Sequence, residues 1–128
     1  MNVPEDLRYT ATHEWVREEG DLLLVGITDP AQEMLGDLVF VGDVQVGRRI
    51  GAGEVAAVVE SVKAAADVYA PAAGEIVAFN EELGSRPELV NRSPYEAWIF
   101  KLKPAQPPQG LLDAAAYRAT VDAKKEAL

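Results

Sequence analysis

One lysine stands alone among small residues near the middle of the chain. Lys63 lies in the stretch "ESVKAAADVYAPAAGEI", which contains no other basic residue and continues with three alanines. Small neighbours leave an ammonium group accessible, and its four-carbon stem gives it reach and rotational freedom. An enzyme that grips such a lysine from outside can acylate it, and the chain would then carry the attached group.

Two other interpretations of Lys63 stay open at this point. An ordinary solvated lysine needs no function, and composition alone favours it. A Schiff-base lysine must be activated by burial or by a nearby cation. The residues around Lys63 supply no cation.

Several kinds of site are excluded by residue types that the chain lacks. It has no cysteine, so it cannot form disulfides or thiolate metal sites, and its single histidine, His13, cannot form a multi-histidine site. The glycines follow neither the dinucleotide-binding nor the Walker spacing. We therefore expect no metal site and no phosphate-binding loop.

The charge of the chain limits its partners. Twenty-one acidic residues against twelve basic ones give a formal net charge of −9. This charge disfavours nucleic acid and anionic membrane surfaces, because their phosphates would be repelled. No apolar run is long enough to cross a bilayer, and the first residues lack the pattern of a signal peptide. We expect a monomer in the cytoplasm, with no nucleic-acid or membrane partner.

The segments on either side of Lys63 are expected to position it. The runs "EVAAVVES" (residues 54–61) and "DVYA" (residues 67–70) favour strands. A turn near residues 61–65 would join them into a hairpin with Lys63 at its tip. Pro71 marks the end of the second strand.

A short helix is predicted over residues 29–35, "DPAQEML". Asp29 is a suitable N-cap, Pro30 suits the first helical position, and Gln32 could reach back as in a capping box. Gly36 is a suitable C-terminal stop.

The remaining segments indicate more strands and a second helix. An alanine-rich helix is expected over about residues 111–127, with Asp113 as its cap and Tyr117 on its inner face. We expect one mainly β domain over residues 1–128, with two small antiparallel sheets packed face to face. The other strand-like runs cover about residues 15–27 with a turn at Gly20, residues 37–47, residues 74–83 and, after a turn-like stretch, residues 97–102.

Several motifs occur in the order found in one known family. They are "YTATHEWV", "VGITDPAQEMLGDLVFV", "ESVKAAADVYAPAAGEIVAFNEEL" and "PELVNRSPYEAWIFKLKP". Together they span about residues 9–117 and resemble the glycine cleavage system H protein family. The stretch "VGDVQVG" departs from the family, in which a proline and a glutamate are common there, and this departure affects only a loop.

The resemblance implies a carrier with no catalytic activity of its own. Lys63 would hold (R)-lipoate through an amide, on the barrel-sandwich hybrid fold of lipoyl and biotinyl carriers. Glycine decarboxylase would load an aminomethyl group, a tetrahydrofolate-dependent aminomethyltransferase would take its carbon, and dihydrolipoamide dehydrogenase would reoxidise the dithiol. The lack of cysteine agrees with sulfur chemistry that arrives with the cofactor. Lipoate-attaching enzymes would read the turn, with Glu60 as the charged contact.

The resemblance also implies that the loaded arm folds back into a surface cleft. The aminomethyl group carries a cationic amine, which a carboxylate can hold. We expect Glu14 and Asp67 to supply carboxylates, Thr12 a hydroxyl, and Met34 an adaptable apolar surface. A simpler interpretation is that Glu14 and Asp67 are solvated charges and that Met34 fills the core.

Alternative functions are distinguished by the residues beside Lys63. Biotin carriers usually place the lysine between two methionines, whereas Val62 and Ala64 flank it here. Lipoyl domains of 2-oxoacid dehydrogenase complexes usually have an acidic residue directly before the lysine, and they lack the "HEW" and "TDPAQ" segments. Here Glu60 lies three residues back. An unmodified interaction module is a third alternative.

Overall fold

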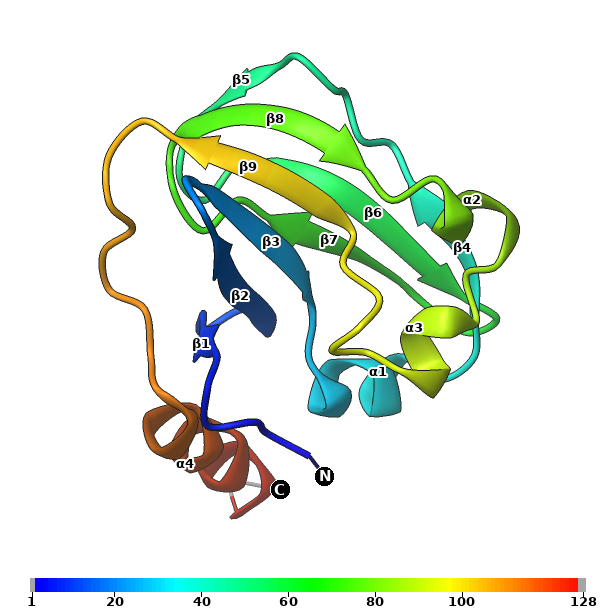
Figure 1. Ribbon diagram of the computed structural model, residues 1–128. Coiled ribbons are helices and arrows are strands. Elements are labelled where there is room, and N and C mark those ends of the chain that lie inside the picture. The colour runs from blue at the N-terminus through cyan, green and yellow to red at the C-terminus, as the bar shows by residue number, and fades with distance from the viewer. Residues whose placement is uncertain (1, 127–128) are drawn as a thin grey trace.

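The computed structural model describes residues 2–126, in which six strands form one antiparallel sheet (Figure 1). Its strand order brings the N-terminal hairpin next to strands from the second half of the chain. In sheet order the strands are β1 (Arg8–Tyr9), β2 (Glu14–Glu19), β3 (Leu22–Ile27), β9 (Phe100–Pro104), β8 (Gly74–Phe79) and β5 (Arg49–Ile50).

The second sheet contains the hairpin predicted around Lys63. Its strands are β4 (Leu38–Gly42), β6 (Val55–Ser61) and β7 (Ala65–Tyr69), with β6 in the centre. Val25 and Phe100 of the first sheet belong to one apolar cluster with Val59 and Val68 of the second. Burial of apolar surface stabilises a fold by about 25 cal/mol per Å². The prediction of a mainly β fold with two antiparallel sheets is confirmed, and the sheets do not close into one barrel.

The N-terminal hairpin shows why glycine is required at one strand position. Strands β2 and β3 turn at Gly20, as predicted, and Trp15 pairs with Gly26 across the hairpin. Trp15 is fully buried, and a Cβ on Gly26 would lie 2.6 Å from its indole atoms. A side chain at this position would displace the tryptophan from the core.

The predicted helix is confirmed as α1 (Asp29–Leu35), but its N-cap is different. Thr28, not Asp29, caps the helix: its Oγ1 accepts a hydrogen bond from Ala31 N at 3.2 Å. Gln32 donates from Nε2 to the Asp29 side chain at 2.8 Å, so it does not form the expected capping box. Gly36 ends the helix at φ 83°, a left-handed conformation that favours glycine.

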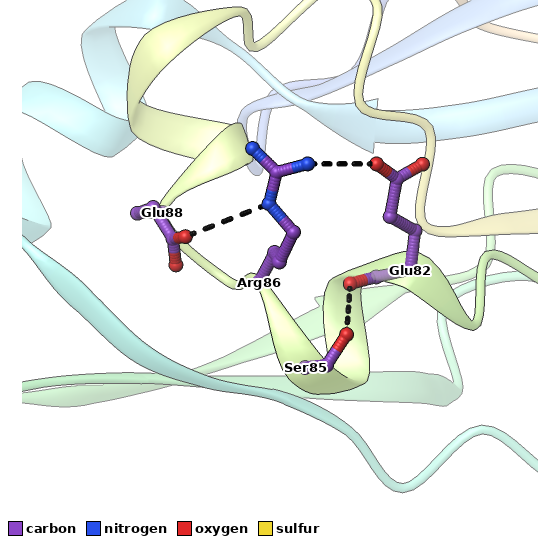
Figure 2. Close-up of polar contacts among 4 residues, drawn as sticks. All are labelled: Glu82, Ser85, Arg86 and Glu88. Carbon is purple, nitrogen blue, oxygen red and sulfur yellow. Dashed lines mark hydrogen bonds and ion pairs between the residues drawn. The ribbon is translucent and has the colours of Figure 1, made fainter.

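Two short helices replace the turn-like stretch predicted after β8. They are α2 (Glu82–Ser85) and α3 (Leu89–Arg92), which bury Leu83 and Val90 respectively. Figure 2 shows Arg86 between them, 3.4 Å from the Glu82 carboxylate and 3.9 Å from that of Glu88. These ion pairs are exposed and contribute little stability, so the buried leucine and valine hold the helices in place.

Strand β9 begins at Phe100, later than the predicted start at residue 97. Ala97 N donates a hydrogen bond back to Ser93 O at 2.9 Å, and Trp98 N donates to Glu96 O at 3.0 Å. These local bonds keep residues 97 and 98 out of the strand ladder, which explains the difference.

The C-terminal helix α4 (Ala114–Glu126) packs beside the N-terminal segment (Figure 1). Its predicted cap is confirmed, because Asp113 Oδ1 accepts a hydrogen bond from Ala116 N at 2.8 Å. The helix starts later than the predicted residue 111, since Leu112 instead bridges to Tyr9, and position 127 lies outside the described residues. None of the helices within residues 2–126 is long and apolar enough to cross a membrane.

Candidate functional site

Lys63 lies at the tip of the β6–β7 hairpin with its side chain exposed. Glu60 and Ala65 are the last pair in the ladder before the turn. The predicted place of Lys63 is therefore confirmed. Glu60 is exposed on the same hairpin, where an approaching protein could contact it.

The side chain of Ser61 organises the turn at the tip. Its Oγ accepts hydrogen bonds from Ala64 N at 3.0 Å and from Lys63 N at 3.3 Å. The backbone adds a bond from Ser61 N to Ala64 O at 2.7 Å. Sequence reasoning missed Ser61, although a serine at the start of a turn is a known signal for this kind of bonding. These hydrogen bonds give the turn a defined conformation.

The hairpin tip rests on the corner between α1 and β4. Val62 N donates to Asp37 O at 3.3 Å. Lys63 Cε lies 3.6 Å from where a Cβ on Gly36 would be, so the lysine stem passes over this glycine. Asn91 of α3 donates to Gly36 O at 2.9 Å and holds the corner from the other side.

A cavity of about 160 Å³ adjoins the hairpin, and all four residues predicted for the arm-docking cleft line it. Thr12 and Glu14 come from the β1–β2 connection and the start of β2, Met34 from α1 and Asp67 from β7. Met34 is 55% exposed, so it does not fill the core. The other lining residues are His13, Ile27, Ala31, Leu35, Val59, Ala66 and Val68.

Glu14 is a buried carboxylate, with only 1% of its surface exposed. Its Oε1 accepts hydrogen bonds from the hydroxyls of Thr10 and Thr12, and its Oε2 accepts one from Tyr69 N at 3.2 Å. Burial raises the pKa of Glu14, and these hydrogen bonds oppose the rise. The interpretation of Glu14 as a solvated charge is therefore wrong. Sequence reasoning also missed Thr10 and Tyr69, which hold this carboxylate in place.

Asp67 differs from Glu14 because its side chain is exposed. It lies at the cavity wall on β7, opposite Val58 of β6. The cavity thus combines an apolar wall with one buried and one exposed carboxylate. Within the described part of the chain, no group of three or more potential metal ligands is present.

Comparison with known proteins identifies the family of the chain. The family model described as "Glycine cleavage H-protein" matches residues 7–124. The chain belongs to the glycine cleavage H-protein family. The match includes the hairpin with Lys63 and every residue that lines the cavity beside it.

Relatives of this H-protein-family chain match it over nearly their whole length. The glycine cleavage system H protein of Bordetella pertussis is 64% identical over 121 residues, which cover 93% of this chain and 98% of the relative. That of Thiobacillus denitrificans is 56% identical, with 97% and 98% covered. The crystal structure of a glycine cleavage system H protein from Mycobacterium marinum superposes with a TM-score of 0.86 at 39% identity, covering 94% of this chain and 99% of the other.

Proposed function

We propose that the chain is the lipoyl carrier of a glycine cleavage system, with Lys63 as the attachment residue. The observation that carries this proposal is the exposed Lys63 on a hydrogen-bonded turn, next to a cavity with a buried carboxylate. Membership of the H-protein family supports a carrier that serves the glycine cleavage system and not a 2-oxoacid dehydrogenase complex.

The chain would hold the lipoyl arm and shield its loaded end, and the cofactor would supply the reactive sulfur. Bound lipoate would supply a dithiol that accepts an aminomethyl group, which agrees with a chain that has no cysteine. We propose glycine decarboxylase, the aminomethyltransferase and dihydrolipoamide dehydrogenase as successive partners.

We further propose that the cavity receives the loaded end of the arm. Ile27, Leu35 and Val68 supply apolar surface for a hydrocarbon chain. Glu14 can accept a hydrogen bond from a primary ammonium once its carboxylate is ionised, and exposed Asp67 adds a second negative charge at the wall. Thr12 can share its hydroxyl between Glu14 and the amine, and Met34 can adapt its shape to the arm.

Lipoate-attaching enzymes are proposed to recognise the shape of the tip. Ser61 fixes the turn, and Glu60 lies beside it as an exposed charge. These enzymes must place one lysine in their own active site, so a turn of defined shape suits them better than a flexible loop. A monomeric state, a single domain and a cytoplasmic location stay predictions.

The experiment that tests the attachment is the intact mass of the protein purified from its own cells. Lipoyl, biotinyl and unmodified lysine differ in mass, and fragmentation places the added group on a residue. We expect a lipoyl mass on Lys63. An unmodified chain in cells with active glycine cleavage would instead support the interaction module.

A further inference from the structure

The hydroxyl of Tyr117 joins the C-terminal helix to two walls of the cavity. It lies 2.6 Å from His13 Nδ1 and 2.7 Å from Thr28 Oγ1. His13 lines the cavity and lies between Thr12 and Glu14 in the chain. Thr28 caps α1, the helix that contributes Met34 to the cavity. One buried hydroxyl therefore contacts both the segment that bears Glu14 and the helix that bears Met34.

The backbone of His13 has an uncommon conformation. Its φ is 73°, in the left-handed region that few non-glycine residues adopt, although histidine is among those found there more often. His13 O accepts a hydrogen bond from Thr28 N at 3.1 Å, and its ring meets Tyr117 edge-on with centroids 5.7 Å apart. The cap of α1 and the ring of Tyr117 thus hold the residue that precedes Glu14.

Tyr117 is itself fixed by the second apolar cluster. It is fully buried and stacks on Tyr9 with ring centroids 4.8 Å apart. Leu7 and Val121 belong to the same cluster. Burial raises the pKa of Tyr117 to about 12, so the hydroxyl keeps its proton at neutral pH. A neutral hydroxyl can donate one hydrogen bond and accept another, as its two neighbours require.

We propose that Tyr117 is a positioning residue for the loaded arm. Helix α4 holds the His13 segment and the start of α1 together through this hydroxyl, and so keeps the cavity in shape around Glu14. The inference rests on the proposed function, because it concerns the same cavity. It gives the C-terminal helix a part in retaining the one-carbon unit, in addition to packing.

The test compares Tyr117→Phe with a matched control, Tyr9→Phe. Both changes remove one hydroxyl from the same buried cluster, but the Tyr9 hydroxyl bonds to Pro4 O and not to a cavity residue. Purified lipoylated carrier is loaded with aminomethyl groups, and ammonia release is followed well below each unfolding midpoint. Tyr117→Phe loses the hydrogen bonds to His13 and Thr28, and we expect it to release ammonia roughly three- to fivefold faster than the parent. Tyr9→Phe should match the parent, although both variants lose some thermal stability.

A second measurement does not require the carrier to be loaded with aminomethyl groups. His13 is the only histidine, so its imidazole signals can be assigned directly in an NMR spectrum. Tyr117→Phe should shift the Nδ1 signal, whereas Tyr9→Phe should leave it in place. If Tyr117→Phe does not fold, Thr28→Gly and Thr28→Ser repeat the comparison. Glycine and serine are both accepted at a helix N-cap, but only serine keeps the hydroxyl that faces Tyr117. Faster release with glycine but not with serine supports the inference, and equal release from both overturns it.

The outcomes separate this inference from the docking proposal. If Glu14→Gln speeds release while Tyr117→Phe behaves like Tyr9→Phe, the role of Tyr117 is overturned and docking stands. If Glu14→Gln also leaves release unchanged, the docking proposal fails and the inference fails with it.

Discussion

Glu14 and Tyr69 join the two sheets through one hydrogen bond. Glu14 Oε2 accepts it from Tyr69 N at 3.2 Å, which links β2 of the six-stranded sheet to β7 of the three-stranded sheet. Strand β7 begins just after Lys63 and also contributes Asp67 to the cavity. The bond therefore sets the position of a buried carboxylate relative to the strand that leads away from the attachment residue.

Glu14→Gln should shorten the lifetime of the loaded arm. Glutamine keeps the shape but removes the charge that would hold the aminomethyl cation. Hydrogen bonds to an ion contribute about 1.5–3 kcal/mol, and the low end corresponds to roughly tenfold faster loss of the one-carbon unit as ammonia and formaldehyde. Ammonia release from loaded carrier measures this effect.

Asp67→Asn is compared with Glu14→Gln in the same measurement of ammonia release. Asp67 is exposed, so solvent weakens its attraction for a cation. We expect a smaller acceleration in the same direction. Equal release from the parent and both variants would remove Glu14 and Asp67 from the functional residues, without affecting Lys63.

The stability of the unloaded protein should depend on pH through Glu14. Its folded-state pKa is raised above the ordinary value of 4.5, mainly by burial, so the folded state favours the neutral acid. The stability that this preference provides is present below the unfolded-state pKa and is lost as pH rises through the folded-state pKa. Glutamine does not titrate. The unfolding midpoint of Glu14→Gln should therefore rise relative to that of the parent between acidic and neutral pH. A difference between the two midpoints that stays constant over this range would contradict the raised pKa.

Lys63→Arg should abolish lipoylation and leave the fold intact. Arginine keeps the positive charge, but its guanidinium does not accept a lipoyl group. Lys103→Arg is the matched control, because Lys103 is also exposed but lies on β9 of the other sheet. Intact mass after incubation with a lipoate-attaching enzyme measures the result. A lipoyl mass on the Lys63→Arg variant would show that another lysine is the acceptor.

Ser61→Ala should slow lipoylation by loosening the turn. It removes the Oγ that accepts hydrogen bonds from Lys63 N and Ala64 N. We expect a loss of about 1 kcal/mol in stability and a several-fold slower gain of lipoyl mass. Ser85→Ala is the control, since the Ser85 hydroxyl donates to Glu82 O at an exposed site on α2, away from the hairpin tip, as Figure 2 shows for the bond. Equal modification rates would mean that the enzyme does not need a preformed turn.

Glu60→Gln should slow lipoylation without a change in stability. An exposed carboxylate contributes little to folding, whereas it can attract a basic surface on the modifying enzyme. The effect should diminish at high salt, because salt screens exposed charges. Glu18→Gln, an exposed carboxylate on β2, should match the parent. Unchanged kinetics for Glu60→Gln would make it an ordinary solvated residue.

Local patterns in the sequence determined several parts of this structure. The valine- and alanine-rich runs around Lys63 indicated the hairpin, and the segment from residue 29 to Gly36 indicated helix α1 with its end. These features depend on strand preference, turn residues and glycine conformation, which act over a few neighbouring residues. Even here, Thr28 replaced Asp29 as the cap, because the choice between adjacent polar residues depends on how the chain enters the helix.

Only the tertiary structure decided how the site is assembled. The positive charge expected on the loaded arm and the family resemblance led us to predict Glu14 as a carboxylate in a surface cleft. Its burial depends on the contact with Tyr69, 55 residues away in the chain. The link between His13 and Tyr117 spans 104 residues and left no pattern in the sequence. Packing of the two sheets and α4 creates these contacts, because side chains that meet across a core need not be close along the chain.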